Sequence, residues 1–516
     1  MARFRPPLVA VLALLLLAVA PPPAAPALPR LVLVLTLDQL RPDYLPRFES
    51  QWTGGFRRLL DQGAVFLEGR QDHALTETAP GHATILSGRH PVHTGIAYND
   101  AGVPDSTVQL VGVAGMGASP RRFRGTTLVD WLRSADTAVR FLSVSRKDRG
   151  AILPIGRSRG PVFWYSGGRF TTSTWYSDTL PAWVTAWDAR GGAPRLAGSR
   201  WQLLLPDSAY AEPDDQPWED GGRETTFPHD LPRDTARAVE ALADRPWIDS
   251  LTFDFALTGA RALGLGQRGR PDLLAVSLSG LDYIGHDWGP DSREVHDHLL
   301  RVDRWLGTFL DSLETLVGKG QLLVVVTADH GVTSFPERAA ALGQPGGRIP
   351  LSRLVRSVNP AVGGALRTSS GLVLVDTMRL KAVRVNRESL ATALAAQVQK
   401  LPGVVDAWTP GTLGAPLPSN IGAARWRRSL PRDLPWLVCA VPRPGYIWSD
   451  GPGSTTHGTS NPDDVNVPIV FMGPGIRAGR HADTVSTVDI APTLAKLLGV
   501  KVGEKVDGRV IKGALR

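Results

Sequence analysis

The stretch LVLVLTLD, residues 31–38, is a run of seven apolar or β-branched residues that ends at a carboxylate. Two similar runs lie further along the chain, LLAVSL over residues 273–278 and LLVVVT over residues 322–327. Each is short and apolar without alternation, which is typical of a strand in a parallel sheet covered on both faces. A fourth run, VPIVFM over residues 467–472, is a weaker strand prediction because it contains Pro468.

Helix-like segments lie between these runs. Residues 292–317 carry apolar side chains at helical spacing: Val295, Leu299, Val302, Leu306 and Leu310. Strands that alternate with helices predict an α/β fold with a mostly parallel sheet.

Two long stretches interrupt the pattern, and we predict both as insertions into one catalytic domain over residues 28–516. Residues from about 155 to 270 are rich in tryptophan, glycine, proline and arginine. Their tryptophans indicate a local core, with a leaving-group pocket as the alternative. Residues from about 336 to 450 contain a short strand–helix passage, 371–400, which we expect Pro- and Gly-rich loops to follow.

The composition excludes several classes of protein. The 516 residues include 57 Lys+Arg against 49 Asp+Glu, a net charge of +8, and a single cysteine. They match a globular protein rather than a disordered, collagenous or multi-span membrane chain. One cysteine excludes an intramolecular disulfide, a cysteine-based zinc finger and an iron–sulfur cluster. No Lys/Arg-rich run of the nucleic-acid-binding kind is present, so the positive charge indicates a solvated surface, or else attraction of anionic substrates.

The first 27 residues have the pattern of an export signal. Arg3 and Arg5 precede an uncharged apolar run over residues 8–20, and Ala25-Pro26-Ala27 is a cleavage site of the A-x-A kind. Thirteen residues are too few for a bilayer core, which needs about 20. We therefore predict a periplasmic or secreted enzyme without stable membrane insertion after cleavage; a retained N-terminal anchor is the alternative.

Acidic and histidine side chains lie at the ends of the predicted strands, where open α/β sheets bind ligands. They are Asp38, Asp282 and His286 in DYIGH, Asp329 and His330 in TADHG, and His457 in STTHGTS. Each alone is weak evidence, because a strand-end Asp is often a helix cap or turn former. Together, three carboxylates and three imidazoles could hold two divalent cations. This mixture suits zinc best, with manganese or iron as alternatives.

The segment TETAPGH, residues 76–82, offers a nucleophile. Thr78 before Ala79-Pro80 has the pattern of a helix N-cap with proline in the first turn. A hydroxyl there lies near the positive end of the helix dipole, and a metal would ease it toward alkoxide. The backbone N–H groups of the same turn can bind phosphate oxygens. We interpret His82 as a capping or packing residue rather than as support for the site.

With Asp38, TETAPGH, DYIGH, TADHG and STTHG in this order, the chain resembles the alkaline phosphatase superfamily of two-zinc hydrolases, over residues 31–110, 270–335 and 455–500. The resemblance implies a three-layer sandwich with helices on both faces of the sheet and inserted cap segments. It also implies that Asp38, Asp329 and His330 hold one zinc ion with Thr78, and that Asp282, His286 and His457 hold the other. Thr78 would attack phosphorus and form a phosphothreonine that is then hydrolysed. In the family a second glycine is expected at the position of Ala79. The resemblance implies that alanine is tolerated there, because the expected contact comes from the backbone N–H and not from a side chain.

Three further residues bear on the branch of the superfamily. The Asn99 amide, in GIAYND, can donate to a phosphoryl oxygen, and SRKDR places Lys147 and Arg149 on one side of an extended segment. A lysine and a forked guanidinium suit the dianionic phosphate of a monoester and fit a diester poorly, although a solvated charged turn is the plain alternative. The set is similar to the threonine-nucleophile, phosphate-irrepressible alkaline phosphatases of bacteria, which are exported enzymes acting on a broad range of small-molecule phosphate monoesters.

Other functions remain open. The nucleotide pyrophosphatase/phosphodiesterase branch shares the threonine and asparagine but generally lacks the lysine–arginine pair, and phosphonate hydrolysis is a further possibility. A binding protein that keeps its metals for structure is the non-enzymatic alternative. A sulfatase is disfavoured because Pro442 comes one place too late after Cys439, which we interpret as a buried apolar residue. The cytosolic, metal-dependent phosphoglycerate mutases do not match the export signal. The sequence leaves the oligomeric state open and is compatible with a monomer.

Overall fold

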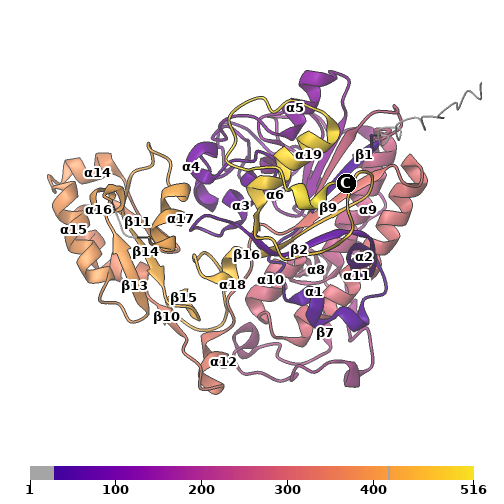
Figure 1. The fold of residues 1–516 in the computed structure, drawn as a ribbon. Helices are drawn as coiled ribbons and strands as arrows, with labels where there is room; N and C mark the ends of the chain where they lie inside the picture. The colour runs from indigo at the N-terminus through magenta and orange to yellow at the C-terminus, as the bar shows by residue number, and fades with distance from the viewer. Residues whose placement is uncertain (1–27, 417–418) are drawn as a thin grey trace, which may run out of the picture.

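The three strongest apolar runs lie next to one another in the middle of a ten-stranded sheet (Figure 1). The computed structural model describes residues 28–416 and 419–516, so the export signal predicted for residues 1–27 lies outside the described residues. The strand order is β17-β2-β16-β9-β1-β8-β3-β4-β5, and β18 pairs with β2. The strands are β1 (Leu31–Leu37), β2 (Ala64–Arg70), β3 (Phe141–Ser145), β4 (Val162–Ser166), β5 (Arg169–Thr171), β8 (Asp272–Leu278), β9 (Leu322–Thr327), β16 (Asn466–Met472), β17 (Gly479–His481) and β18 (Val485–Ser486).

Most neighbouring strands of this sheet are parallel. β1 runs parallel to β8 and β9, and β3 runs parallel to β8 and β4. The exceptions are β16, antiparallel to β9 and β2, and the β4–β5 pair. The prediction of an α/β fold with a mostly parallel sheet is confirmed.

Alternate residues of each central strand enter two different cores. In β1, Leu33 and Leu35 pack into a core with helices α2 (Gly55–Gln62), α9 (Trp247–Ala262) and α11 (Arg293–Val317). Val32 and Val34 pack into a second core with α3 (Thr78–Ile85), α5 (Leu128–Ala135) and α19 (Ile490–Leu498). Burial on both faces explains why these strands are apolar without alternation.

Pro468 is accommodated by an irregularity in β16. The pairing of β16 with β2 shifts register between Val467 and Ile469, which flank the proline. A residue without a backbone N–H is tolerated where the ladder is already interrupted. The weakest of the four predicted strands therefore forms.

A smaller antiparallel sheet lies to one side of the large one, drawn in orange in Figure 1. Its order is β11 (Leu366–Ser369), β12 (Leu372–Val375), β14 (Trp436–Pro442) and β13 (Val404–Trp408). The predicted strand–helix passage is present as β12, α14 (Thr377–Ala382) and α15 (Arg387–Val398).

The prediction of loops after residue 400 is wrong, because β13, α17 (Ile421–Ser429) and β14 lie there. The glycines and prolines of this stretch mark the turns between short elements instead of one long loop. Cys439 in β14 is buried, in agreement with its interpretation as a small apolar residue.

The stretch from about 155 to 270 contributes directly to the large sheet. β4 and β5 are its edge strands, and α9 covers one of its faces. Trp187 and Trp201 are buried in the same core as Leu33 of β1, so the local core predicted for these tryptophans is in fact the main core. Trp187 packs against Phe255 of α9, and Trp201 packs against Trp288 and donates a hydrogen bond to Asp297 of α11.

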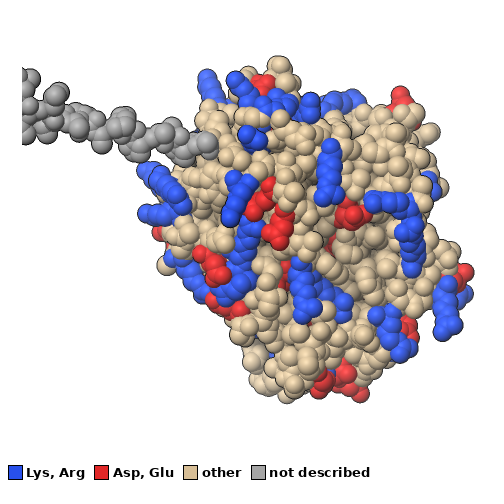
Figure 2. Space-filling view, turned by 90° about the vertical axis from the view of Figure 1, so that its right-hand side faces the viewer, with Lys and Arg blue, Asp and Glu red and all other residues tan. Residues whose placement is uncertain are grey.

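Two further features concern possible binding to nucleic acids and to membranes: the distribution of surface charge and the hydrophobicity of the helices. On the face shown in Figure 2, basic side chains are dispersed among acidic ones instead of gathering in one patch. Within residues 28–416 and 419–516, no helix has both the length and the apolar character needed to cross a bilayer.

Candidate active site

The predicted ligands converge where three parallel strands end. Asp38 follows β1, and Asp329 and His330 follow β9. α10 (Gly280–Asp287) follows β8 and carries Asp282 and His286 one helical turn apart. The register places Leu37 of β1 beside Leu278 of β8, and Thr36 beside Thr327 of β9, so the three carboxyl ends lie at the same level.

The first group of ligands is Asp38, Asp329 and His330. The Nε2 atom of His330 lies 3.3 Å from Asp38 Oδ1 and 3.5 Å from Asp329 Oδ2. All three side chains are fully buried, and none of these three atoms has a hydrogen-bond partner in the described part of the chain. Buried polar atoms are almost always satisfied, so three orphaned ligand atoms facing one another fit a divalent cation.

The second group is Asp282, His286 and His457. Asp282 Oδ1 lies 3.3 Å from Nε2 of His286 and 3.5 Å from Nε2 of His457. The Nδ1 atoms of these histidines donate to the carbonyls of Thr455 at 2.8 Å and Thr76 at 2.6 Å. Each Nε2 is thereby left with its lone pair toward the carboxylate, the arrangement that outer hydrogen bonds impose on metal-binding histidines.

Lys147 lies between the two groups. Its Nζ is 2.5 Å from Oδ2 of Asp38 and 2.5 Å from Oδ2 of Asp282. As a result, Asp38, His330 and Asp282 each offer a ligand atom within 4.8 Å of the others, so Asp282 takes the place in this group that was expected for Asp329. The ammonium contacts one carboxylate from each group, so the six ligands do not form two separate sets as sharply as the resemblance implies.

Burial and neighbouring charges shift the pKa values of these groups. Burial, with the charges of Asp282 and Asp329, raises the pKa of Asp38 well above its usual range. Burial alone would also raise the pKa of Asp282, but Lys147 and His286 outweigh it and hold that pKa well below the usual value. Burial lowers the pKa of His330 to about 3, which keeps the imidazole neutral, as a metal ligand must be.

Thr78 is the first residue of α3, not its N-cap as predicted. Glu77 holds the N-cap position, with an extended backbone of φ −111° and ψ 160°, and no side chain caps the helix. Because the Thr78 hydroxyl is not used for capping, it is free to face the site. Its Oγ1 lies 3.4 Å from Lys147 Nζ, and the residue is buried.

Gly81 and His82 fix the start of α3 against Asp329. A Cβ atom on Gly81 would lie 2.2 Å from the carbonyl oxygen of Asp329, so no larger residue fits. His82 Nδ1 lies 3.1 Å from Asp329 Oδ2 and 3.0 Å from the carbonyl oxygen of Thr78, and Nε2 lies 2.9 Å from the Ser277 hydroxyl. His82, interpreted from the sequence as a capping or packing residue, contacts a candidate ligand directly.

Asn99 begins a short helical turn, η2 (Asn99–Ala101), beside the start of α3. Its Oδ1 accepts a hydrogen bond of 2.8 Å from the backbone N–H of Ala79. This N–H was expected to be available to phosphate and is used by Asn99 instead. With Oδ1 occupied, the Asn99 amide is left with its NH₂ group as the donor for a ligand.

The prediction that Lys147 and Arg149 lie on one extended segment is wrong. Lys147 is extended, but α6 (Asp148–Ile152) begins at the next residue and places Arg149 in its first turn. The Arg149 guanidinium lies 3.7 Å from Asp148, and its buried Nε has no partner in the described residues. The structure therefore brings Lys147, rather than both cations, into contact with Thr78.

Gln39 is a residue of the site that the sequence pattern did not reveal. Its backbone N–H donates to Asp329 Oδ1 at 3.3 Å, and its side-chain amide donates to Asp282 Oδ1 at 2.9 Å. It does so from a left-handed backbone with φ 72°, which is rare for a residue other than glycine. Only its position directly after Asp38 could have drawn attention to it.

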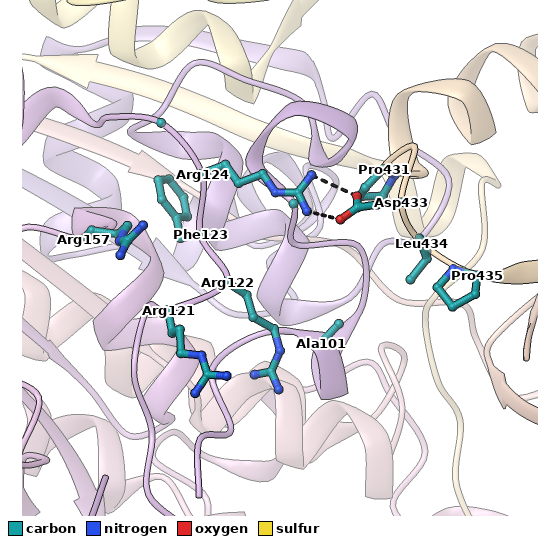
Figure 3. Close-up of a pocket in the computed structure, with 12 residues that line it drawn as sticks. Ala101, Arg121, Arg122, Phe123, Arg124, Arg157, Pro431, Asp433, Leu434 and Pro435 are labelled. Carbon is teal, nitrogen blue, oxygen red and sulfur yellow. Dashed lines mark hydrogen bonds and ion pairs between the residues drawn. The ribbon is translucent and has the colours of Figure 1, made fainter. Parts of the chain in front are cut away.

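A separate cavity of about 700 Å³ lies between the part of the fold built on the large sheet and the segment before β14, and its lining includes none of the candidate ligands (Figure 3). Its lining includes Arg121, Arg122, Arg124 and Arg157 on one side and Asp433 on the other. Arg124 donates to Asp433 at 3.0 Å, so this cavity includes an ion pair that links the two parts of the fold.

Comparison with known proteins gives long matches. A family model described as type I phosphodiesterase / nucleotide pyrophosphatase matches residues 32–463. The alkaline phosphatase PhoV of Synechococcus elongatus is 32% identical over 527 residues, covering 96% of this chain and 94% of that protein. The alkaline phosphatase PafA of Elizabethkingia meningoseptica is 31% identical over 524 residues, covering 94% of each. A crystal structure of wild-type PafA matches with a TM-score of 0.88 at 30% identity, covering 95% of this chain and 99% of that one.

Proposed function

The chain belongs to the type I phosphodiesterase / nucleotide pyrophosphatase family, and we propose that within it the chain is an alkaline phosphatase that hydrolyses small-molecule phosphate monoesters. The resemblance to the alkaline phosphatase superfamily is confirmed by these relatives, and the chain is a metal-dependent hydrolase of phosphoric esters. The observation that carries the proposal is the position of Thr78, whose hydroxyl meets Lys147 beside two groups of buried metal ligands.

The ligand groups fit two divalent cations, and we propose zinc for both. Asp38, Asp329 and His330 would hold one ion with Thr78, and Asp282, His286 and His457 the other. When bound, the ions supply positive charge that favours an ionised hydroxyl and stabilises oxyanions. Carboxylates mixed with imidazoles are the donors that zinc accepts, and each histidine presents Nε2 to a carboxylate.

The residues of the chain then perform a two-step displacement. The Thr78 hydroxyl gives up its proton to solvent and its Oγ attacks phosphorus, so that a new O–P bond forms. The bond from phosphorus to the leaving oxygen breaks, and that oxygen takes up a proton from solvent and departs as the alcohol, which leaves a phosphothreonine. Water then attacks the same phosphorus, the Oγ–P bond breaks, and phosphate and the free hydroxyl are released. His82 holds Asp329 and the start of α3 in place during both steps.

Three side chains would stabilise the transferring phosphoryl group. Lys147 is already at the nucleophile, Asn99 has its NH₂ group available, and Arg149 has an unpaired buried Nε among the described residues. Charge placed in advance around the non-bridging oxygens is often the largest part of catalysis. A monoester offers three such oxygens, which matches three donors.

The second candidate function is phosphodiester hydrolysis, which the description of the family model favours. Lys147 distinguishes the two, because its ammonium lies where the second substituent of a diester would compete for space beside Thr78. Turnover of p-nitrophenyl phosphate and bis-p-nitrophenyl phosphate by the zinc-loaded enzyme separates them. We expect kcat/KM to favour the monoester by at least about 100-fold, near 3 kcal/mol of discrimination, and a preference for the diester would contradict the proposal.

We also propose that residues 28–516 form one catalytic domain with insertions near residues 155–270 and 336–450. The first insertion adds β4, β5 and α9 to the large sheet and its core.

We further propose that the enzyme is exported. The export proposal rests on the basic start and apolar run of residues 3–20. Fractionation of cells that express the full chain tests it. Activity should lie outside the cytoplasm, and Leu14→Arg, which interrupts the apolar run, should retain the protein inside. Activity confined to the cytoplasm for the unaltered chain would contradict export.

A further inference from the structure

Glu77 is a buried carboxylate between Thr76 and Thr78 that the displacement described above does not use. It is only 6% exposed. One oxygen, Oε2, accepts from the backbone N–H of Asn99 at 2.8 Å. The other, Oε1, accepts from the hydroxyls of Ser369 at 2.7 Å and Ser370 at 3.1 Å. A buried carboxylate that accepts three hydrogen bonds is held firmly in one position.

The contact with Asn99 closes a small ring of interactions around the nucleophile. Glu77 holds the backbone of Asn99, and Asn99 Oδ1 in turn accepts from the N–H of Ala79. Both ends of this ring belong to the segment that carries Thr78. The Asn99 amide is therefore fixed at its backbone and at its oxygen, which leaves one orientation for its NH₂ group.

The serines come from the small sheet. Ser369 ends β11, and Ser370 lies in the two-residue turn before β12, with φ 47°. A serine in the left-handed region at a turn is unusual, and such strain persists where surrounding contacts maintain it. The same turn abuts the segment of His457, since a Cβ on Gly458 would lie 2.2 Å from the Ser370 hydroxyl.

We propose that Glu77 is a positioning residue that fixes Asn99 and docks the β11–β12 turn beside the nucleophile, so that the Asn99 NH₂ group meets the phosphoryl group at Thr78. This rests on the proposed function of Asn99. The role is geometric and does not need the charge of Glu77. Glutamine can keep the contact with Asn99 through its oxygen, because serine hydroxyls can accept from its NH₂ group.

A double-mutant cycle with p-nitrophenyl phosphate tests the coupling. Glu77→Ala should lower kcat/KM roughly 10- to 100-fold, and Glu77→Gln should stay within about threefold of the unaltered enzyme. In the background of Asn99→Ala, Glu77→Ala should lower kcat/KM by no more than about twofold, because the two changes disrupt the same interaction. An equal fold-loss in both backgrounds, or a loss with Glu77→Gln as large as with Glu77→Ala, would overturn the proposal.

The two serines provide a further discrimination. The double change Ser369→Ala and Ser370→Ala removes both of the turn's hydrogen bonds to Glu77 but leaves the contact between Glu77 and Asn99, so kcat/KM should fall by less than about threefold. A loss as large as that of Glu77→Ala would mean that docking of the turn alone accounts for the effect without any contribution from the contact with Asn99, and would overturn the proposal that Glu77 acts by positioning the Asn99 NH₂ group.

Hydrogen–deuterium exchange reads the positioning without turnover. In Glu77→Ala, amide exchange should accelerate in the peptides that carry η2 and the β11–β12 turn. Glu212 provides the matched control: it is 7% exposed and accepts from Arg47 and His296 at 2.9 and 2.8 Å. Glu212→Ala should leave exchange in both peptides unchanged.

Unchanged exchange of η2 in Glu77→Ala would overturn the positioning role. Absence of monoester turnover by the unaltered zinc-loaded enzyme would instead refute the proposed function, so the two failures are distinguishable.

Discussion

The ammonium nitrogen of Lys147 lies 3.4 Å from the hydroxyl oxygen of Thr78, and it also contacts the carboxylates of Asp38 and Asp282. One positive charge is thus shared by the candidate nucleophile and by a ligand from each metal group. Burial would lower the pKa of Lys147, but Asp282 and Asp38 outweigh it and raise that pKa, so the side chain stays charged at the pH of the reaction.

Lys147 should therefore matter more for monoesters than for diesters. We expect Lys147→Ala to lower kcat/KM for p-nitrophenyl phosphate by about 100-fold, near 3 kcal/mol, because a charge-assisted contact to the dianion is lost. For bis-p-nitrophenyl phosphate we expect less than about a threefold change. Arg149→Ala should show the same preference with a smaller loss, since the guanidinium of Arg149 contacts Asp148, whereas the ammonium of Lys147 contacts Thr78.

Steady-state kinetics on both substrates, at matched zinc content, measure these effects. Lys319→Ala is the control, because Lys319 is exposed on another surface. Equal losses on both substrates would argue against a role of Lys147 in monoester recognition.

Metal removal should affect stability as well as turnover. Without metal, the positive charge that faces the buried acids Asp38, Asp282 and Asp329 comes from Lys147, Arg149 and nearby imidazoles. We expect chelation to abolish turnover and lower the melting temperature, and zinc to restore both, because a metal that binds only the folded state stabilises it.

His457→Ala should reduce the bound zinc from about two ions to about one per chain, whereas His93→Ala should retain both, since His93 is exposed and pairs with Asp507. Metal analysis with thermal unfolding measures this. A melting temperature that is insensitive to chelation would contradict the two-metal assignment.

Gly81 provides a test of how α3 is positioned. A methyl group there would meet the Asp329 carbonyl at 2.2 Å, so Gly81→Ala must displace the helix that carries Thr78. We expect a destabilisation of about 1–3 kcal/mol, the usual cost of overpacking, together with loss of most activity. Gly411→Ala is the matched control in helix α16 (Pro410–Gly414), where the nearest atom is 3.9 Å away, and should be neutral or slightly stabilising. Chemical denaturation and turnover would measure both, and a stable, active Gly81→Ala variant would contradict the packing described.

The strands, and the convergence of the candidate ligands at their carboxyl ends, could be predicted from local pattern because each has a local cause. β1 and β9 begin and end where their apolar runs do, since burial on both faces selects such runs. Candidate ligands follow those strands directly, so the sheet brings Asp38, Asp329 and His330 together.

The remaining features depend on contacts between distant segments. Gln39 is fixed by Asp282 in α10 and by Asp329 after β9, and Glu77 by serines nearly 300 residues away. The β13–β14 pair was missed because glycines and prolines at its turns obscure short strands whose partners lie elsewhere in the chain. Arg149 was misplaced because the periodicity of SRKDR does not reveal that α6 begins at Asp148.

Glu219 predicts a pH dependence of stability that is separate from catalysis. Burial, with the charges of Glu294 and Asp214, raises the pKa of Glu219 from 4.5 to about 10. Between these values the folded chain keeps a proton that the unfolded chain releases, so stability decreases as pH rises through this interval. Glu219→Gln removes the penalty and should be about 1–3 kcal/mol more stable than the unaltered chain at pH 9, with no gain at pH 4.

Urea denaturation at the two pH values, on the zinc-loaded protein, measures the difference. Glu240→Gln, at an exposed position, should show no pH-dependent gain. A benefit of Glu219→Gln that is equal at pH 4 and pH 9 would show that Glu219 is not held protonated by the fold.

The central claim is that Thr78 takes the phosphoryl group from a monoester, and trapping the covalent intermediate tests it most directly. The zinc-loaded enzyme is mixed with p-nitrophenyl phosphate, quenched in acid within the first turnover, digested and sequenced by mass spectrometry. We expect phosphate on Thr78 in the TETAPGH peptide, partial retention of labelling and turnover in Thr78→Ser, and neither in Thr78→Ala, which should lose at least about 1,000-fold in kcat/KM. Unlabelled Thr78 at full turnover, or a zinc-loaded Thr78→Ala enzyme that turns over at the rate of the unaltered chain, would contradict the account.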